Sequence, residues 1–477
     1  MGWCENVDHD WKTQVALLTA VVGVGKSAVA HTIAHLCAER GILLSAFFFG
    51  IVTSPQRLWS GVARSLATKN ESYRRILTSI MENDPNIAAD TFDKQFKKLI
   101  LEPLRNTPPL GNSPLVIVID GFDECDNDAA ETLAALFKDN ISDLPPWVKF
   151  FVTSRPVRVV NRYFDSLPSV HHLSIQLSDD NNLRDCEAYV ATKVSELKGL
   201  HWDTPPAWPP DLQDMLVKRA RGLFVWVSVV TKYLRTKSMN PVVALEDLLG
   251  EDISRDDVPA EEQLDNLYTA IFGECNWRDK AFKHNYPIVM GAIVAAKSPL
   301  SIMAWEALLV PLLFRGTSVR DTISELRPLF TGMDEPSVPI QLLHQSVRDY
   351  LKWRPVGVPV KLEPSEDEER LALRCFTVIN TEIRKVTELG VIEGLGDMDM
   401  MPSIPQKDIS EQLAYACRYG PDHISRIQHI PETLEIEVKK FLEENITNSW
   451  ELCVRTGRYI PIHPFFDWIE VSHGIAR

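Results

Sequence analysis

The sequence predicts a doubly wound α/β domain with a mainly parallel sheet, followed by mainly helical domains. Over residues 12–180, short apolar stretches alternate with segments of helical periodicity, which is typical of a parallel sheet covered by helices. After residue 181 the apolar residues recur with the helical period, and strands are nearly absent until residues 338–343. The fold class therefore changes along the chain.

Five strands and four helices are expected in the first part. The stretches 42–49 and 115–119 are apolar without alternation, so we expect both strands to be buried on two faces. The expected strands are 15–20, 42–49, 114–120, 148–153 and 170–177, and the expected helices are 27–40, 55–68, 90–105 and 127–139.

A phosphate-binding loop, AVVGVGKS at residues 20–27, follows the first strand. Its glycines let backbone N–H groups form a concave anion site, and the next helix directs its positive dipole end at the phosphates. In this pattern Lys26 contacts the β- and γ-phosphates, and the Ser27 hydroxyl binds Mg²⁺. Ala20 replaces the usual first glycine and tolerates positive φ less well. The expected nucleotide-binding residues here are Ala20, Gly23, Val24, Gly25, Lys26 and Ser27.

An acidic turn, GFDE at residues 121–124, follows the third expected strand, which ends in Asp120. The carboxyl ends of strands are where open α/β sheets bind ligands. We expect Asp120 to hold Mg²⁺ through water, and either Asp123 or Glu124 to polarise the attacking water as general base. The alternative is a buried strand that ends in an acidic turn without catalytic function.

Arg155 follows the fourth expected strand and points to the same ligand-binding edge. An arginine there can contact the γ-phosphate or signal its presence. Taken by itself, an arginine at such a position is more often a surface residue. Together, the three motifs predict a site for ATP or ADP with Mg²⁺.

These motifs resemble the NACHT branch of the STAND nucleotide-binding switches, specifically the nephrocystin-like NACHT proteins abundant in fungi. The order of the motifs is more specific than any one of them. The similar segments are GVGKS at 23–27, FFF at 47–49, VIDGFDE at 118–124, FVTSRP at 151–156, GLFVW at 222–226, PLSI at 299–302, LLHQSVRDYL at 342–351 and LAYACRY at 413–419, with Asp422 and His423 after it.

The resemblance implies an α/β P-loop NTPase followed by all-α helical and winged-helix domains. It implies an ATP/ADP-binding regulatory switch with slow ATP hydrolysis, used in signalling or self/non-self recognition, with protein partners or a homo-oligomer in the ATP state. His344 is expected to contact the β-phosphate of bound ADP and to lock the closed state. The implied domains are a NACHT domain at 1–180, a helical domain at 181–275, a winged helix at 276–355 and a C-terminal helical segment at 356–477.

Two other interpretations stay open. Members of the family usually carry an N-terminal effector and a C-terminal repeat sensor, often a WD-repeat propeller, and the sequence shows neither. These departures and Ala20 would fit a non-catalytic interaction protein, or a truncated paralogue, whose P-loop has decayed. A small-molecule kinase would need an acceptor pocket and an arginine-bearing lid, and residues 181–360 show neither clearly.

Composition bears on compartment and partners. A formal net charge of -15 argues against an electrostatic surface for nucleic acid or anionic membranes. The eight cysteines lack metal-ligand spacing and are expected to be buried thiols in a reducing compartment. There is no basic secretory leader, and no apolar run reaches the roughly 18 residues of a membrane span. We therefore expect a cytoplasmic protein without nucleic-acid or membrane partners.

Overall fold

The protein folds into two compact units, Met1–Gln263 and Leu264–Arg477, and each is described by itself. The finer division into four domains stays a prediction. The computed structural model describes residues 1–5, 13–50, 57–85, 87–108, 113–125, 127–165, 167–202, 205–237, 240–249, 258–386 and 404–456.

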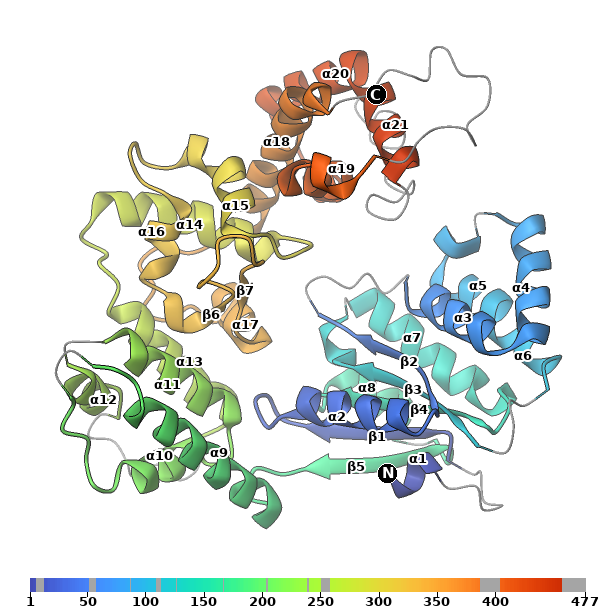
Figure 1. Cartoon of the computed structure of the whole chain (residues 1–477), viewed down its shortest axis with the longest axis horizontal. Helices are drawn as coiled ribbons and strands as arrows, with labels where there is room; N and C mark the ends of the chain where they lie inside the picture. Colours follow the sequence, from blue (N-terminus) through green and yellow to red (C-terminus); the bar gives the residue numbers. More distant parts are fainter. Residues whose placement is uncertain are drawn as a thin grey trace. The chain divides into compact units, whose positions relative to one another are not determined.

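The first unit is built on a five-stranded parallel sheet with the order β2-β3-β4-β1-β5 (Figure 1). This sheet and the helical region that follows it confirm the predicted fold class. The strands are β1 (Val15–Ala20), β2 (Leu43–Phe48), β3 (Leu115–Asp120), β4 (Val148–Ser154) and β5 (Val170–Ile175).

Helices cover both faces of this sheet, and alternate residues of β1 pack against different helices. Val15 and Leu17 belong to one core, shared with α3, α7 and α8, whereas Ala16 and Leu18 belong to a second core, shared with α2. Burial on both faces explains why the central strands are apolar without alternation. The helices are α1 (Gly2–Glu5), α2 (Lys26–Glu39), α3 (Arg57–Lys69), α4 (Glu71–Asn83), α5 (Phe92–Gln95), α6 (Glu102–Arg105), α7 (Asn127–Asn140) and α8 (Arg158–Phe164).

Some elements differ from the expectation. β2 is an edge strand with one neighbour, and within it only Leu44 is fully buried, so the prediction of burial on two faces was wrong for this strand. The helix expected at 90–105 is interrupted by a π-helical segment, Phe96–Leu101. The helices α1, α4 and α8 were not expected. The N-terminus of α4 is capped by Asn70, whose side chain accepts a hydrogen bond from the Tyr73 N–H at 3.0 Å.

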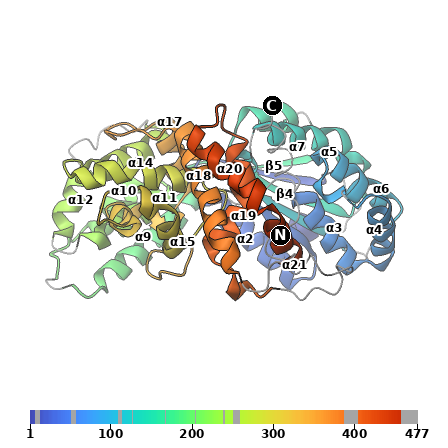
Figure 2. The same ribbon diagram turned by 90° about the horizontal axis from the view of Figure 1, so that it is seen from above.

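Beyond β5 the first unit is helical, and the second unit combines helices with a small antiparallel pair. β6 (Phe330–Thr331) pairs with β7 (Gln341–Leu342), and an isolated bridge joins Ser301 to Pro339. The helices α18, α19 and α20 pack together (Figure 2). The remaining helices are α9 (Asp180–Lys198), α10 (Leu212–Ala220), α11 (Phe224–Thr236), α12 (Pro241–Leu249), α13 (Ala260–Gly273), α14 (Lys280–Ala295), α15 (Ile302–Leu309), α16 (Val319–Ser324), α17 (Gln345–Trp353), α18 (Pro364–Glu382), α19 (Glu411–Ile424), α20 (Glu432–Glu444) and α21 (Ile446–Thr456).

A buried polar network joins α18 and α19 to the loop after α14. The Glu368 carboxylate accepts from Lys297 Nζ at 3.1 Å and from His423 Nδ1 at 2.5 Å. Tyr415 Oη lies 2.8 Å from His423 Nε2, and it accepts from the backbone N–H of Lys297 at 3.2 Å. Burial lowers the pKa of His423, so its neutral ring serves as donor at Nδ1 and as acceptor at Nε2. The network gives Tyr415 and His423 a structural role.

Glu368→Gln should destabilise the second unit by about 1.5–3 kcal/mol, because partly buried Lys297 and fully buried His423 lose their charged acceptor. The matched control is Glu366→Gln on the same helix: the Glu366 side chain is 64% exposed, and its loss should cost less than about 0.5 kcal/mol. Urea unfolding of the full chain, with hydrogen exchange in α18 and α19, measures both. Equal effects of the two substitutions would contradict a stabilising role for the network.

Candidate functional site

The loop between β1 and α2 has the backbone that a phosphate-binding loop requires. Gly23 has φ 81° and Gly25 has φ 94°, both in the left-handed region, and α2 begins directly afterwards at Lys26. Ala20 is the last residue of β1, where it pairs with Ile175. Because this position is extended, alanine replaces glycine there without backbone strain. The departure at Ala20 therefore leaves the geometry of the loop intact.

The Lys26 ammonium is held within the same loop. Its Nζ donates to the backbone carbonyls of Ala20 and Val21, both at 3.0 Å. Burial lowers the pKa of Lys26, and the negative charge of Asp123 partly offsets this effect. The ammonium group thus lies at the loop, on the side of the acidic turn. Ser27, the next residue of α2, is exposed.

Asp120 ends β3 in a fully enclosed position. Its side chain is buried, and its Oδ1 accepts a hydrogen bond from the hydroxyl of Thr153 on neighbouring β4. The Thr153 hydroxyl also accepts from the backbone N–H of Gly121 at 3.1 Å. Thr153 therefore fixes both the carboxylate and the start of the acidic turn. Sequence reasoning missed Thr153, although a hydroxyl at the end of an otherwise apolar strand was a usable signal.

The structure distinguishes the two acidic residues of the turn. Asp123 Oδ2 forms an ion pair with Arg155 Nε at 2.5 Å, and Asp123 Oδ1 accepts from the Arg155 backbone N–H at 2.8 Å. Burial alone would raise the pKa of Asp123, but the charge and hydrogen bonds of Arg155 hold it below its ordinary value. The Glu124 carboxyl group lies beside Gly50 and Gly121. The Asp123 carboxylate therefore holds the Arg155 side chain in place.

A turn from the helical region packs against the phosphate-binding loop. The Val225 backbone N–H donates to the Gly23 carbonyl at 3.4 Å. A Cβ atom on Gly23 would lie 2.6 Å from Val225 Cγ1, so the two backbones approach closely. No local pattern in the sequence pointed to this contact, because it joins residues about two hundred positions apart.

His344 belongs to the second unit, where it caps α17. Its Nδ1 accepts from the Ser346 backbone N–H at 3.1 Å and lies 2.8 Å from the Ser346 hydroxyl, which in turn lies 2.7 Å from the Tyr268 hydroxyl. The histidine thus orders the start of the helix. Its contact with bound nucleotide stays a prediction.

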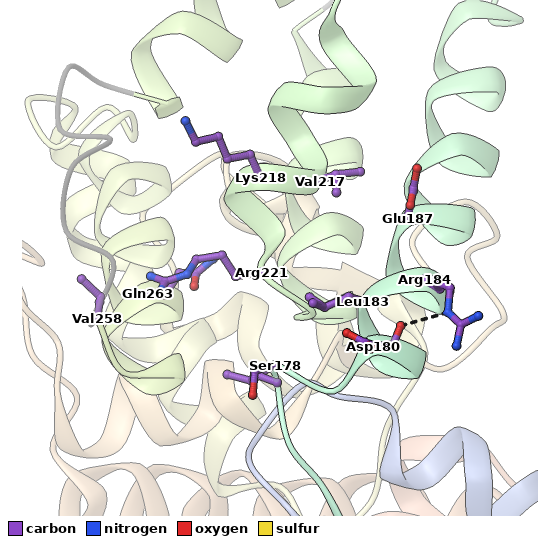
Figure 3. A pocket seen from close by; sticks show the side chains of 11 residues that line it. Ser178, Asp180, Leu183, Arg184, Glu187, Val217, Lys218, Arg221, Val258 and Gln263 are labelled. Atoms are coloured by element: carbon purple, nitrogen blue, oxygen red, sulfur yellow. Dashed lines mark hydrogen bonds between the residues drawn. The ribbon is translucent and has the colours of Figure 1, made fainter.

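A hollow of about 810 Å³ lies between the starts of α9 and α13 and the end of α10 (Figure 3). Its charges are mixed: Asp180 and Glu187 face it together with Arg184, Lys218 and Arg221. None of the predicted site residues lines it. The hollow is therefore separate from the phosphate-binding loop.

Two histidines on α2 lie four residues apart, at a spacing that is compatible with metal binding. His31 stacks on Phe48, with ring centroids 4.0 Å apart, and His35 pairs with Glu39 at 3.3 Å. Within the described ranges, no group of three or more His, Cys, Asp or Glu side chains could hold a metal ion. Among the helices in those ranges, none is both long and apolar enough to span a membrane.

Part of the first unit is similar to a known protein family. Residues 3–155 match the family model described as "Nephrocystin 3, N-terminal". This match supports a nephrocystin-like P-loop NTPase. No curated protein matches the chain.

Two solved structures are also similar to the chain. The Walker-type ATPase PABY2304 of Pyrococcus abyssi is 12% identical, with 71% of this chain and 90% of that chain covered and a TM-score of 0.30. A Drosophila ORC structure bound to DNA is 12% identical, with 73% of this chain and 91% of that chain covered and a TM-score of 0.31. Similarity at this level carries no argument about function.

Asp123→Asn should lower the free energy of unfolding by about 1–3 kcal/mol at pH 6, because Arg155 loses a charged and largely buried partner. The folded-state pKa of Asp123 is depressed, so its contribution is complete above the unfolded value of about 3.9 and is lost as the pH falls through the folded value. Wild type should therefore keep its full advantage over the variant from pH 6 down to about pH 4, and lose it only as the pH falls further, toward about pH 2. Denaturant unfolding at pH 6, pH 4 and pH 2 tests this, and a difference independent of pH would contradict the charged pair.

Proposed function

We propose that the protein is an ATP/ADP-binding regulatory switch of the NACHT (STAND) type, with slow ATP hydrolysis. One observation carries the proposal. The order of the sheet places the loop before α2 and the acidic turn after β3 at the same edge, on either side of the end of β4. A left-handed glycine nest, a lysine and carboxylates at one edge are the elements that bind and hydrolyse a nucleoside triphosphate.

The residues present fit a nucleotide with Mg²⁺. The phosphates would accept hydrogen bonds from the N–H groups of residues 23–27, and Lys26 Nζ would exchange its loop carbonyls for phosphate oxygens. Ser27 and Asp120 would hold Mg²⁺, since it prefers oxygen ligands and Asp120 is already oriented by Thr153. When bound, the ion neutralises charge on the phosphate oxygens.

Glu124 is the better candidate for general base. Asp123 already accepts hydrogen bonds from the backbone and the side chain of Arg155, and its depressed pKa makes it a weak base. Under this proposal Asp123 holds Arg155 toward the γ-phosphate, and Arg155 reports whether that phosphate is present. The two acidic residues expected from the sequence thus take different roles.

The switch itself would involve the second unit. The order of α14, α15 and α16 followed by the β6–β7 pair supports the winged-helix expectation. In the proposal, His344 contacts the β-phosphate of ADP in the closed state, and the ATP state exposes surfaces for protein partners or for another copy of the chain. Only differential binding of the two nucleotides to the two states would drive this change.

Lys26→Ala should abolish detectable nucleotide binding and leave the fold intact, because the ammonium pairs with phosphate and is not a core group. Lys69→Ala, at an exposed position at the end of α3, is the control and should bind as wild type does. Calorimetry with ATP and Mg²⁺ measures the affinities, and circular dichroism checks the fold. Wild-type affinity in Lys26→Ala would contradict the assignment of residues 20–27 as a nucleotide-binding loop.

Glu124→Gln should preserve ATP binding and lower turnover by about a hundredfold or more, the usual value of general-base catalysis. Asp123→Asn should lower turnover less, because it disturbs the orientation of Arg155 and leaves the base in place. Phosphate release at saturating ATP measures both variants. Should Asp123→Asn be the more damaging substitution, the two roles are reversed.

A further inference from the structure

The turn that touches the phosphate-binding loop has an unusual backbone. α10 ends at Ala220. Arg221 follows with φ 50° and Gly222 with φ 84°, so two successive residues lie in the left-handed region. Arg221 is the only residue other than glycine with positive φ in the described part of the chain. The reversal brings Leu223 and Val225 directly onto the loop at Gly23. Such a turn is strained and needs external support.

Asn182, in the first turn of α9, supplies that support. Its side chain is buried, and its Nδ2 donates to the carbonyls of Leu177 at 3.2 Å and of Gly222 at 3.3 Å. A Cβ atom on Gly222 would lie 2.3 Å from Asn182 Nδ2, so only glycine allows this approach. The two donated bonds join the segment between β5 and α9, the start of α9 and the turn. A polar side chain buried in this way is held by its partners.

The contact at Gly23 has a consequence for phosphate binding. The peptide between Gly23 and Val24 is planar and trans, so its C=O and N–H groups point in opposite directions. The Gly23 carbonyl points toward the Val225 N–H, which donates to it at 3.4 Å. The Val24 N–H therefore points away from the turn, and this donor is one of those expected to bind phosphate. The turn thus fixes the direction of a phosphate-binding group.

We propose that Asn182 is a positioning residue for the nucleotide site: by holding the 221–225 turn against Gly23, it keeps the Val24 N–H oriented toward phosphate and so sets how long a nucleotide stays bound. This inference rests on the proposed function. The inference extends the proposed function by assigning a role to Asn182, whose side chain lies outside the phosphate-binding and acidic motifs. The ligand concerned is a nucleoside diphosphate or triphosphate.

The test compares Asn182→Ala with Asn181→Ala in the full chain. Asn181 is the exposed neighbour on α9, and its side chain accepts a hydrogen bond from Arg184, so the control removes the same chemical group without touching the turn. A fluorescent ADP analogue is released by dilution into excess ADP, well below the melting temperature. We expect release from Asn182→Ala to be about five- to tenfold faster than from Asn181→Ala, the usual value of a lost hydrogen bond. The association rate should change little.

Two further measurements keep the outcome unambiguous. Asn182→Asp preserves the size of the side chain but cannot donate to the two carbonyls, so it should also release the analogue faster. Hydrogen exchange in residues 221–226 of the nucleotide-free protein should rise in both Asn182 variants and not in Asn181→Ala. The inference would be overturned if wild type and both Asn182 variants bind the analogue and release it at the same rate. It would also be overturned if the Asn182 variants have a lower melting temperature but an unchanged release rate. No binding by wild type would instead contradict the proposed function, and hydrogen exchange would still decide whether Asn182 holds the turn.

Discussion

The position of β4 between β1 and β3 is the constraint on which the candidate site depends. Neighbouring strands are about 4.8 Å apart, so the strand that leads into the phosphate-binding loop and the strand that ends in Asp120 are separated by about 10 Å. The end of β4 fills this gap and orders the acidic turn on the β3 side of it. Thr153 holds Asp120 and Gly121, and the next two residues of the chain hold Asp123.

One buried carboxylate in each unit is bound by an ionic partner and by a further hydrogen bond. In the first unit the Asp123 side chain is 3% exposed and is bound by Arg155. In the second unit Glu368 is bound by Lys297 and His423. Such pairs stabilise little relative to apolar packing, but removing one partner is costly because the other charge stays buried. They therefore specify geometry more than they add stability.

The sequence predicted the sheet well, because its strands are short, apolar and bounded by clear breaks. It also predicted a concave anion nest at Gly23 and Gly25, and the left-handed backbone of both glycines fits that motif, since the motif encodes local backbone geometry. It did not decide between Asp123 and Glu124, because that choice depends on which side chain Arg155 meets across the sheet edge. The contact of Val225 with Gly23 was beyond prediction for the same reason. Local patterns fix backbone conformation, whereas long-range pairing depends on the whole fold.

The central claim is that the first unit holds a nucleotide tightly enough for its identity to set the state of the protein. The most direct measurement is to unfold the purified full chain and to identify the released nucleotide by chromatography. The account predicts ADP in near-stoichiometric amount, since a closed switch retains the product of hydrolysis. A protein that releases no nucleotide, and that binds neither ATP nor ADP when either is added with Mg²⁺, would contradict it.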